Sequence, residues 1–253
     1  MKEITISNND LFIFEDRDDL SIGAADEIAT LAQEAVKKTG RFALSLAGGS
    51  TPRQLYTLLA SEPWVKQMPW GKTHIFFGDE RCVSHSAAES NFKMINEALL
   101  SKVPIPKGNI HAPVGQESNP EQAAWNYQQQ LIDFFGGQVP VFDLVLLGLG
   151  PEGHTASIFP NSPAASERQR LVVSYRVDDE HGWRMTMTFP VINAARHVMF
   201  LVAGSEKQEI VGQIFSEAAN GHQIPAKLVA PQSGMLTWYF DEAAAEKLAQ
   251  SIG

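Results

Sequence analysis

The sequence has one cysteine, Cys82, among its 253 residues. A single cysteine excludes an intramolecular disulfide and any cysteine-rich metal site. Cations are also in the minority, because 20 lysines and arginines stand against 29 aspartates and glutamates, for a formal net charge of −9. A clustered basic surface for nucleic acid is therefore not expected. A site for a small anion stays possible, since it needs only a few local cations.

Long apolar runs are missing as well. The longest, over residues 141–150, is about half the length of a membrane-spanning helix, and the opening MKEITISNND has no apolar signal-peptide core. Hydrophobic residues make up 44% of the chain and charged residues 19%, which is typical of a globular protein. We therefore expect a soluble, cytoplasmic protein without a membrane partner, either a monomer or a small homo-oligomer.

Short apolar runs alternate with longer amphipathic stretches along the chain. The pattern predicts strands over residues 11–14, 42–47, 74–77, 142–147, 171–177, 185–189, 197–203 and 236–240, and helices over 20–38, 52–59, 91–100, 121–135, 206–218 and 241–250. Such alternation indicates an α/β fold, with a mostly parallel, Rossmann-like sheet and helices on both faces. We expect residues 171–177 and 185–189 to form a strand pair near one edge of the sheet. Residues 160–170 are expected to form a loop at the surface. The whole chain, residues 1–253, is expected to form one domain.

Ligands of open α/β sheets bind beyond the carboxyl ends of the strands, so the segments that follow the buried strands are the first candidates for a binding site. The segment GGSTP, residues 48–52, follows one of them. Ser50 or Thr51 is expected to cap a helix that has Pro52 in its first position. Together with Gly49 they would present free N–H groups at a positive helix end, which suits a phosphate. The alternative is an ordinary strand-to-helix turn.

Two further segments place cations at the same edge. In GDER, residues 78–81, Arg81 is expected to grip a phosphate while Asp79 or Glu80 holds it in place. The alternative is a structural ion-pair cluster.

In GSEKQ, residues 204–208, Ser205 and Gln208 are expected to form a capping box. Lys207 then falls in the first helical turn, where the helix dipole disfavours a cation, and this indicates anion binding. The alternative is a lysine that points to solvent.

The fourth segment, GLGPEGHTAS over residues 148–157, contains a formal G-x-G-x-x-G. Pro160 and Pro163 leave room for barely two helical turns, too few for the crossover helix of a dinucleotide-binding unit, so no such cofactor is predicted. No zinc-ligand spacing occurs either. The segment is expected to present Glu152 and His154 at a short helix start, where a neutral His154 acts as a base and Glu152 orients it. The alternative is a structural histidine.

Several segments then carry a family resemblance. They are SLAGGSTP (45–52), FFGDER (76–81), ESNF (89–92), LLGLGPEGHTASIFP (146–160), RMTMTFPVINAARHVMFLVAGSEK (184–207) and LTWYFDEAA (236–244). In these segments the chain resembles the bacterial type of 6-phosphogluconolactonase, which shares its fold with glucosamine-6-phosphate deaminase. The resemblance implies hydrolysis of 6-phospho-D-glucono-1,5-lactone to 6-phosphogluconate, the second step of the oxidative pentose phosphate pathway.

The resemblance also implies roles for residues. His154 would activate the attacking water, and Arg81 and Lys207 would hold the 6-phosphate near the loop at residues 49–51. Arg184 matches a basic family position that reaches toward substrate. A lactone carbonyl is already electrophilic, so a base and water suffice without a metal or cofactor. Backbone N–H groups of the glycine-rich loop, those of Gly150 and Gly153, are candidates to stabilise the developing oxyanion.

Three departures from the family pattern stand out. Glu152 occupies a position where the family usually has aspartate, Lys227 stands where it often has serine, and residues 177–182 lack the usual proline-rich stretch. Lys227 either faces solvent or adds a cation near the site.

Two other functions compete with the lactonase. Sugar-phosphate deaminases continue GHIAFNEP after the shared Gly-His pair, whereas this chain reads GHTASIFP over residues 153–160 and lacks the second acidic residue. A non-enzymatic sugar-phosphate sensor would need a fused DNA-binding helix-turn-helix, for which the chain has neither the length nor the charge.

Overall fold

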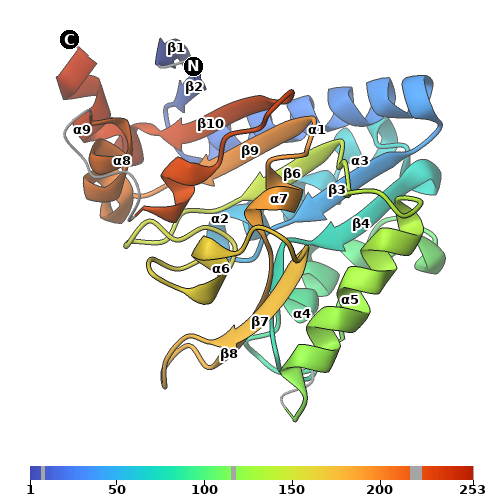
Figure 1. Cartoon of the computed structure of the whole chain (residues 1–253). Coiled ribbons are helices and arrows are strands. Elements are labelled where there is room, and N and C mark those ends of the chain that lie inside the picture. Colours follow the sequence, from blue (N-terminus) through green and yellow to red (C-terminus); the bar gives the residue numbers. More distant parts are fainter. Residues whose placement is uncertain (7–8, 115–117, 217–223, 253) are drawn as a thin grey trace.

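The computed structural model describes residues 1–6, 9–114, 118–216 and 224–252 (Figure 1). Within them, seven strands form one sheet, in the order β1-β2-β10-β9-β6-β3-β4. Only β1 and β2 pair antiparallel, while all other neighbours run parallel. The strands are β1 (Lys2–Ile6), β2 (Asn9–Phe14), β3 (Phe42–Leu46), β4 (Thr73–Phe77), β6 (Leu144–Leu147), β9 (His197–Val202) and β10 (Met235–Asp241). The predicted α/β fold with a mostly parallel sheet is confirmed.

Helices cover both faces of this sheet (Figure 1). Within β6, Val145 and Leu147 face one apolar core and Leu144 and Leu146 the other, which explains its unbroken apolar sequence. The helices are α1 (Arg17–Thr39), α2 (Ser50–Leu59), α3 (Trp64–Gln67), α4 (Asn91–Ile95), α5 (Pro120–Phe134), α6 (Pro163–Ser166), α7 (Phe189–Ile192), α8 (Gln208–Phe215) and α9 (Glu242–Ile252). Among the described residues, no helix combines the length and apolar character that crossing a membrane requires.

A second, smaller sheet corrects one prediction. The segments expected as a strand pair at the edge of the main sheet form β7 (Val172–Arg176) and β8 (Trp183–Met187) instead in a separate antiparallel sheet. Its third strand, β5 (Asp79–Arg81), is the charged segment that directly follows β4. Pairing of β5 with β8 places Arg81 opposite Arg184.

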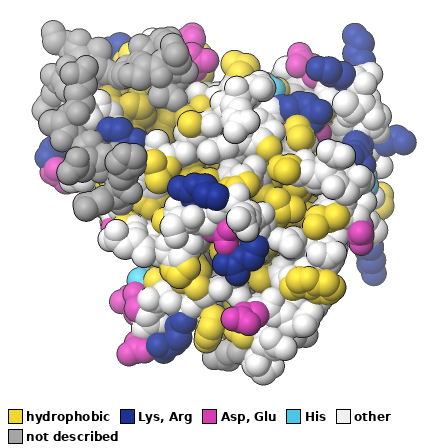
Figure 2. Space-filling view, in the orientation of Figure 1, with side chains coloured by type: hydrophobic (Ala, Val, Ile, Leu, Met, Phe, Trp, Pro, Cys, Tyr) yellow, Lys and Arg dark blue, Asp and Glu magenta, His cyan; other side chains and the backbone are white. Residues whose placement is uncertain are grey.

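Charges of both signs are scattered over the face drawn in Figure 2 rather than gathered into one basic patch. This distribution agrees with the acidic excess of the composition, a formal net charge of −9. An anion site on this face therefore depends on a few local cations and not on a broad positive surface.

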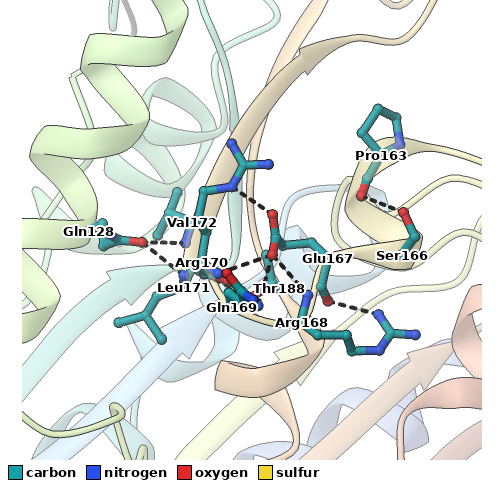
Figure 3. A network of polar contacts seen from close by, with 10 residues as sticks. All are labelled: Gln128, Pro163, Ser166, Glu167, Arg168, Gln169, Arg170, Leu171, Val172 and Thr188. Atoms are coloured by element: carbon teal, nitrogen blue, oxygen red, sulfur yellow. Dashed lines mark hydrogen bonds and ion pairs between the residues drawn. The ribbon is translucent and has the colours of Figure 1, made fainter.

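The surface loop expected over residues 160–170 is exposed in part, but its end is held by hydrogen bonds (Figure 3). The Glu167 carboxylate accepts from the N–H groups of Arg168 (2.9 Å), Gln169 (2.8 Å) and Arg170 (3.1 Å), and from Nε of Arg170 (2.6 Å). These bonds, that from Gln169 first, lower the pKa of Glu167 to about 2. The side chain of Gln128 on α5 accepts from the N–H of Leu171 (2.8 Å), the residue directly before β7, and so fixes the start of that strand.

Candidate active site

A cavity of about 270 Å³ lies where β3, β6 and β9 of the parallel sheet reach their carboxyl ends. All four segments singled out in the sequence contribute to it. The lining residues are Ala47–Pro52, Asp79, Arg81, Asn91, Gly148–Pro151, His154, Ala156, Leu201–Ala203, Glu206 and Lys207. This is the edge at which open α/β sheets bind their ligands.

The GGSTP segment forms the first turn of α2, but not with the expected cap. The helix begins at Ser50, Gly49 is its N-cap residue with φ of 106°, and no side chain caps it, so the capping role predicted for Ser50 or Thr51 is wrong. That φ lies in the region that favours glycine. The N–H groups of Ser50 and Thr51 donate to no acceptor in the described part of the chain. They face a cavity from a helix N-terminus, an arrangement that suits an anion.

Arg81 points into the cavity, held by partners that the sequence did not identify. Its Nη1 donates to Oδ1 of Asn91 (2.8 Å) and to the carbonyl oxygen of Glu89. Neither of the expected carboxylates forms an ion pair with it in the described structure, and its buried Nε has no partner there. The guanidinium therefore keeps both charge and donor capacity for a ligand.

Glu80 has a structural role. Its fully buried carboxylate accepts from the N–H groups of Arg81, Asn91 and Phe92, each at 2.7 Å, so it fixes the chain that supplies Asn91. Burial raises the pKa of Glu80, while these three hydrogen bonds oppose that shift.

Asp79 and Glu206 are the two carboxylate side chains among the residues that line the cavity. Asp79 accepts at Oδ2 from Oγ of Ser157 (2.6 Å) and at Oδ1 from Nδ2 of Asn91 (3.2 Å). It thereby joins the loop after β4 to the loop that carries His154. The sequence analysis did not identify Asn91 as a cavity residue. The signal that could have pointed to it is that Asn91 lies in ESNF, one of the segments that carry the family resemblance.

His154 lies in a turn, and no helix starts there. Residues 155–158 form a tight turn closed by a bridge between Thr155 and Ile158, so the expected influence of a helix dipole on His154 is wrong. The imidazole stacks on Phe159 with ring centroids 4.1 Å apart. A Cβ at Gly150 would lie 2.1 Å from its Nδ1, so the ring packs directly on that glycine. The side chain is 25% exposed, enough to meet a ligand in the cavity.

Glu152 lies next to His154 but outside the cavity lining. Its Oε1 is 2.9 Å from Nδ1 of His154, without the geometry of a hydrogen bond. The carboxylate is thus close to the imidazole, but the hydrogen bond by which Glu152 was expected to orient His154 does not form in the described structure.

The oxyanion role expected for Gly150 and Gly153 is not supported by the geometry. The N–H of Gly150 donates to the carbonyl of His154 (2.9 Å), and the N–H of Gly153 donates to the carbonyl of Gly150 (3.0 Å). Both donors therefore close the loop itself. Gly153 has φ of +85°, and the hydroxyl of Thr155 binds the Gly148 carbonyl (2.9 Å), so the glycines shape the turn that presents His154.

Lys207 lines the cavity from the side of β9. It ends a 3₁₀ turn, Ser205–Lys207, that precedes α8, and the capping box expected from Ser205 and Gln208 does not form. Among the described residues, no carboxylate pairs with Lys207. Asp241 instead fixes this turn by accepting from the N–H of Gly204 (2.9 Å).

Comparison with known proteins decides the family. The model of the family described as glucosamine-6-phosphate isomerases/6-phosphogluconolactonase matches residues 15–238. The chain belongs to this family. The 6-phosphogluconolactonase of Synechocystis sp. is 43% identical over 224 residues, which cover 87% of this chain and 90% of that protein. The 6-phosphogluconolactonase of Nostoc sp. is 40% identical over 240 residues, which cover 94% of this chain and 97% of that protein.

Solved structures agree with this assignment. The structure of 6-phosphogluconolactonase from Trypanosoma cruzi has a TM-score of 0.85 and 30% identity, with 98% of this chain and 99% of that one covered. A monomeric glucosamine-6-phosphate deaminase, at 22% identity and a TM-score of 0.77, shares the fold. The family resemblance and the fold expected from the sequence are confirmed.

Three other residues of this family member lie outside the cavity lining. Arg184 sits opposite Arg81 on β8, and burial, followed by the Arg81 charge, lowers its pKa. Lys227 donates to the carbonyl of Ser216 (3.0 Å) and is not a lining residue, so it does not add a cation to the cavity wall. Cys82 is buried and is not among the residues that line the cavity.

Proposed function

We propose that this chain is a 6-phosphogluconolactonase, which hydrolyses 6-phospho-D-glucono-1,5-lactone to 6-phosphogluconate. The observation that carries the proposal is the cavity itself, which brings an imidazole, His154, together with two cations, Arg81 and Lys207, that have no carboxylate partner in the described chain. The names of the relatives at 40–43% identity support the same reaction.

The anionic end of the substrate binds where donors and positive charge converge. Arg81 and Lys207 hold the 6-phosphate, and the N–H groups of Ser50 and Thr51 donate to it from the start of α2. Arg184 is the cross-strand partner of Arg81 and adds positive potential from outside the cavity lining. Binding of the phosphate, remote from the carbonyl, fixes the ring for attack.

The reaction itself needs one base. His154 takes a proton from a water molecule as the oxygen of that water attacks the lactone carbonyl carbon. The tetrahedral intermediate then collapses, the bond from that carbon to the ring oxygen breaks, and the imidazolium returns the proton to the leaving ring oxygen. The nearby Glu152 carboxylate favours the imidazolium that forms between these steps. No cofactor enters this scheme.

A coupled assay tests the function. The purified chain is offered 6-phosphogluconolactone and, in parallel, glucosamine 6-phosphate. The proposal predicts lactone hydrolysis well above the spontaneous rate and no ammonia release from the amino sugar. Ammonia release, or binding of both sugars without turnover of either, would favour the deaminase or the sensor and overturn the proposal.

A further inference from the structure

Three of the four tyrosines of the chain make the same unusual contact. The hydroxyls of Tyr56, Tyr127 and Tyr175 each donate to a backbone carbonyl and accept from a backbone N–H. All three side chains are buried, with 0%, 3% and 8% of their surface exposed. Burial raises the pKa of each phenol, so each hydroxyl keeps the proton that it donates.

Tyr56 reaches back from α2 to the end of β3. Its hydroxyl accepts from the N–H of Ala47 (2.9 Å) and donates to the carbonyl of Ala47 (2.7 Å). Ala47 lies one residue past β3, beyond the described ladder, and is itself buried. Without the phenol, both of its backbone groups would lack a partner. The residues that follow, Gly48 and Gly49, lead into the N–H groups at the start of α2.

Tyr127 does the same from α5 for the end of β4. Its hydroxyl accepts from the N–H of Phe77 (2.9 Å) and donates to the Phe77 carbonyl (3.0 Å). Because β4 is the last strand of the main sheet, its outward edge has only an isolated bridge, from Ile75 to Ile110, and Phe77 at its end pairs with the phenol instead. The next residues are Gly78, Asp79 and the strand that carries Arg81, so this contact fixes the origin of the cationic side of the cavity.

Tyr175 reaches from β7 to the loop of His154. Its hydroxyl donates to the carbonyl of Ser157 (2.7 Å) and accepts from the N–H of Phe159 at the longer distance of 3.4 Å. Phe159 is the ring on which His154 stacks, and Ser157 donates its hydroxyl to Asp79. The third phenol therefore acts on the turn that presents the imidazole.

We propose that Tyr56, Tyr127 and Tyr175 are positioning residues, and that their phenols fix the three backbone segments from which the site is built. Tyr56 places the anion-binding N–H groups, Tyr127 places Arg81 and Asp79, and Tyr175 places His154. None of the three side chains lines the cavity, so each acts through the backbone that it holds. The proposal rests on the lactonase function and goes beyond it. It assigns support of phosphate binding to Tyr56 and Tyr127, and support of the catalytic base to Tyr175, although none of the three lines the cavity.

Single-hydroxyl deletions test the division. Tyr56→Phe and Tyr127→Phe are expected to raise KM for the lactone about tenfold with kcat within about twofold, because they disturb phosphate binding. Tyr175→Phe is expected to lower kcat about tenfold with KM within about twofold, because it disturbs the base. The matched control is Tyr239→Phe, since Tyr239 is also buried in the core beside the rings of Phe12 and Phe14, while its hydroxyl forms no hydrogen bond within the described residues. Its kinetics should stay within about twofold of wild type.

Two further measurements keep the outcome clear. Circular dichroism identifies the variants that fold, and amide hydrogen exchange at Ala47, Phe77 and Phe159 should accelerate in the matching variant only. The proposal is overturned if all folded variants behave like Tyr239→Phe. It is also overturned if the three other variants change kcat and KM in the same way, without the expected division between binding and chemistry.

The affinity for inorganic phosphate separates this proposal from the lactonase function. Should the wild type not hydrolyse the lactone, titration calorimetry with phosphate still applies. Loss of about fivefold or more in Tyr56→Phe and Tyr127→Phe, with Tyr239→Phe unchanged, supports the positioning role. Equal affinity in all four proteins refutes it.

Discussion

Arg81 and Lys207 carry charges that no carboxylate of the described chain neutralises. Substituting Arg81→Ala or Lys207→Ala should therefore weaken binding of the phosphorylated substrate more than it slows the chemistry. Hydrogen bonds to charged groups contribute about 1.5–3 kcal/mol, so KM should rise roughly 10- to 100-fold. Steady-state kinetics with the lactone measures the effect.

Lys227→Ala is the matched control for the lysine substitution. Lys227 donates to the carbonyl of Ser216 and lies outside the cavity lining, so KM should stay unchanged. A larger effect at Lys227 than at Lys207, or unchanged KM and kcat in both cavity variants, would place the phosphate elsewhere.

Residues that directly follow buried strands were the ones that the sequence could identify. Arg81, His154 and Lys207 all lie in such segments, and the structure places all three on one cavity. Asn91 could not be found in this way, because its role is a contact with Arg81 formed only in the folded chain. The same limit applies to Glu80, whose partners are backbone groups from the far side of a loop.

Glu167 stabilises the turn before β7 through three backbone N–H groups and Arg170. Its pKa lies below the ordinary value, so this stabilisation is full above about pH 4.5 and is lost as the pH falls toward about 2. Glu167→Gln should lower Tm at pH 6, by about 2–4 °C for each kcal/mol lost in a chain of this size. The difference from wild type should narrow as the pH falls below 4.5.

Thermal unfolding followed by circular dichroism between pH 6 and pH 3 measures this dependence. Glu62→Gln is the control, because Glu62 pairs with Lys66 while both side chains are about two-thirds exposed, at 67% and 72%. A difference between Glu167→Gln and wild type that is independent of pH would contradict the role assigned to the carboxylate.

At the level of elements, alternation of apolar runs and amphipathic stretches was sufficient to predict six of the seven strands of the main sheet, while β1 (Lys2–Ile6) was missed. The second sheet was not predictable, because β5 is a short charged strand, DER, that pairs only with the distant β8. The helix expected at His154 failed for a local reason. The carbonyls and N–H groups of Gly150, Gly153 and His154 bond within the loop and leave a turn in its place.

At the scale of the whole molecule, we propose that residues 1–253 act as one domain. β4 of the main sheet runs through Gly78 into β5 of the second sheet, and α5 belongs to the core of the first while Gln128 holds β7 of the second. The acidic excess, with 29 acidic against 20 basic residues, coexists with an anion site because the cations of that site are few and close to one edge. Cytoplasmic location and oligomeric state stay predictions.

The central claim is that His154 is the base of a lactonase. The most direct measurement is kcat/KM for 6-phosphogluconolactone in His154→Asn, beside His197→Asn, whose histidine starts β9 at the opposite edge of the sheet. Loss of a general base should lower the rate by about 10²- to 10⁴-fold while circular dichroism stays unchanged, and His197→Asn should keep its activity. Near-normal turnover by a correctly folded His154→Asn would contradict the account.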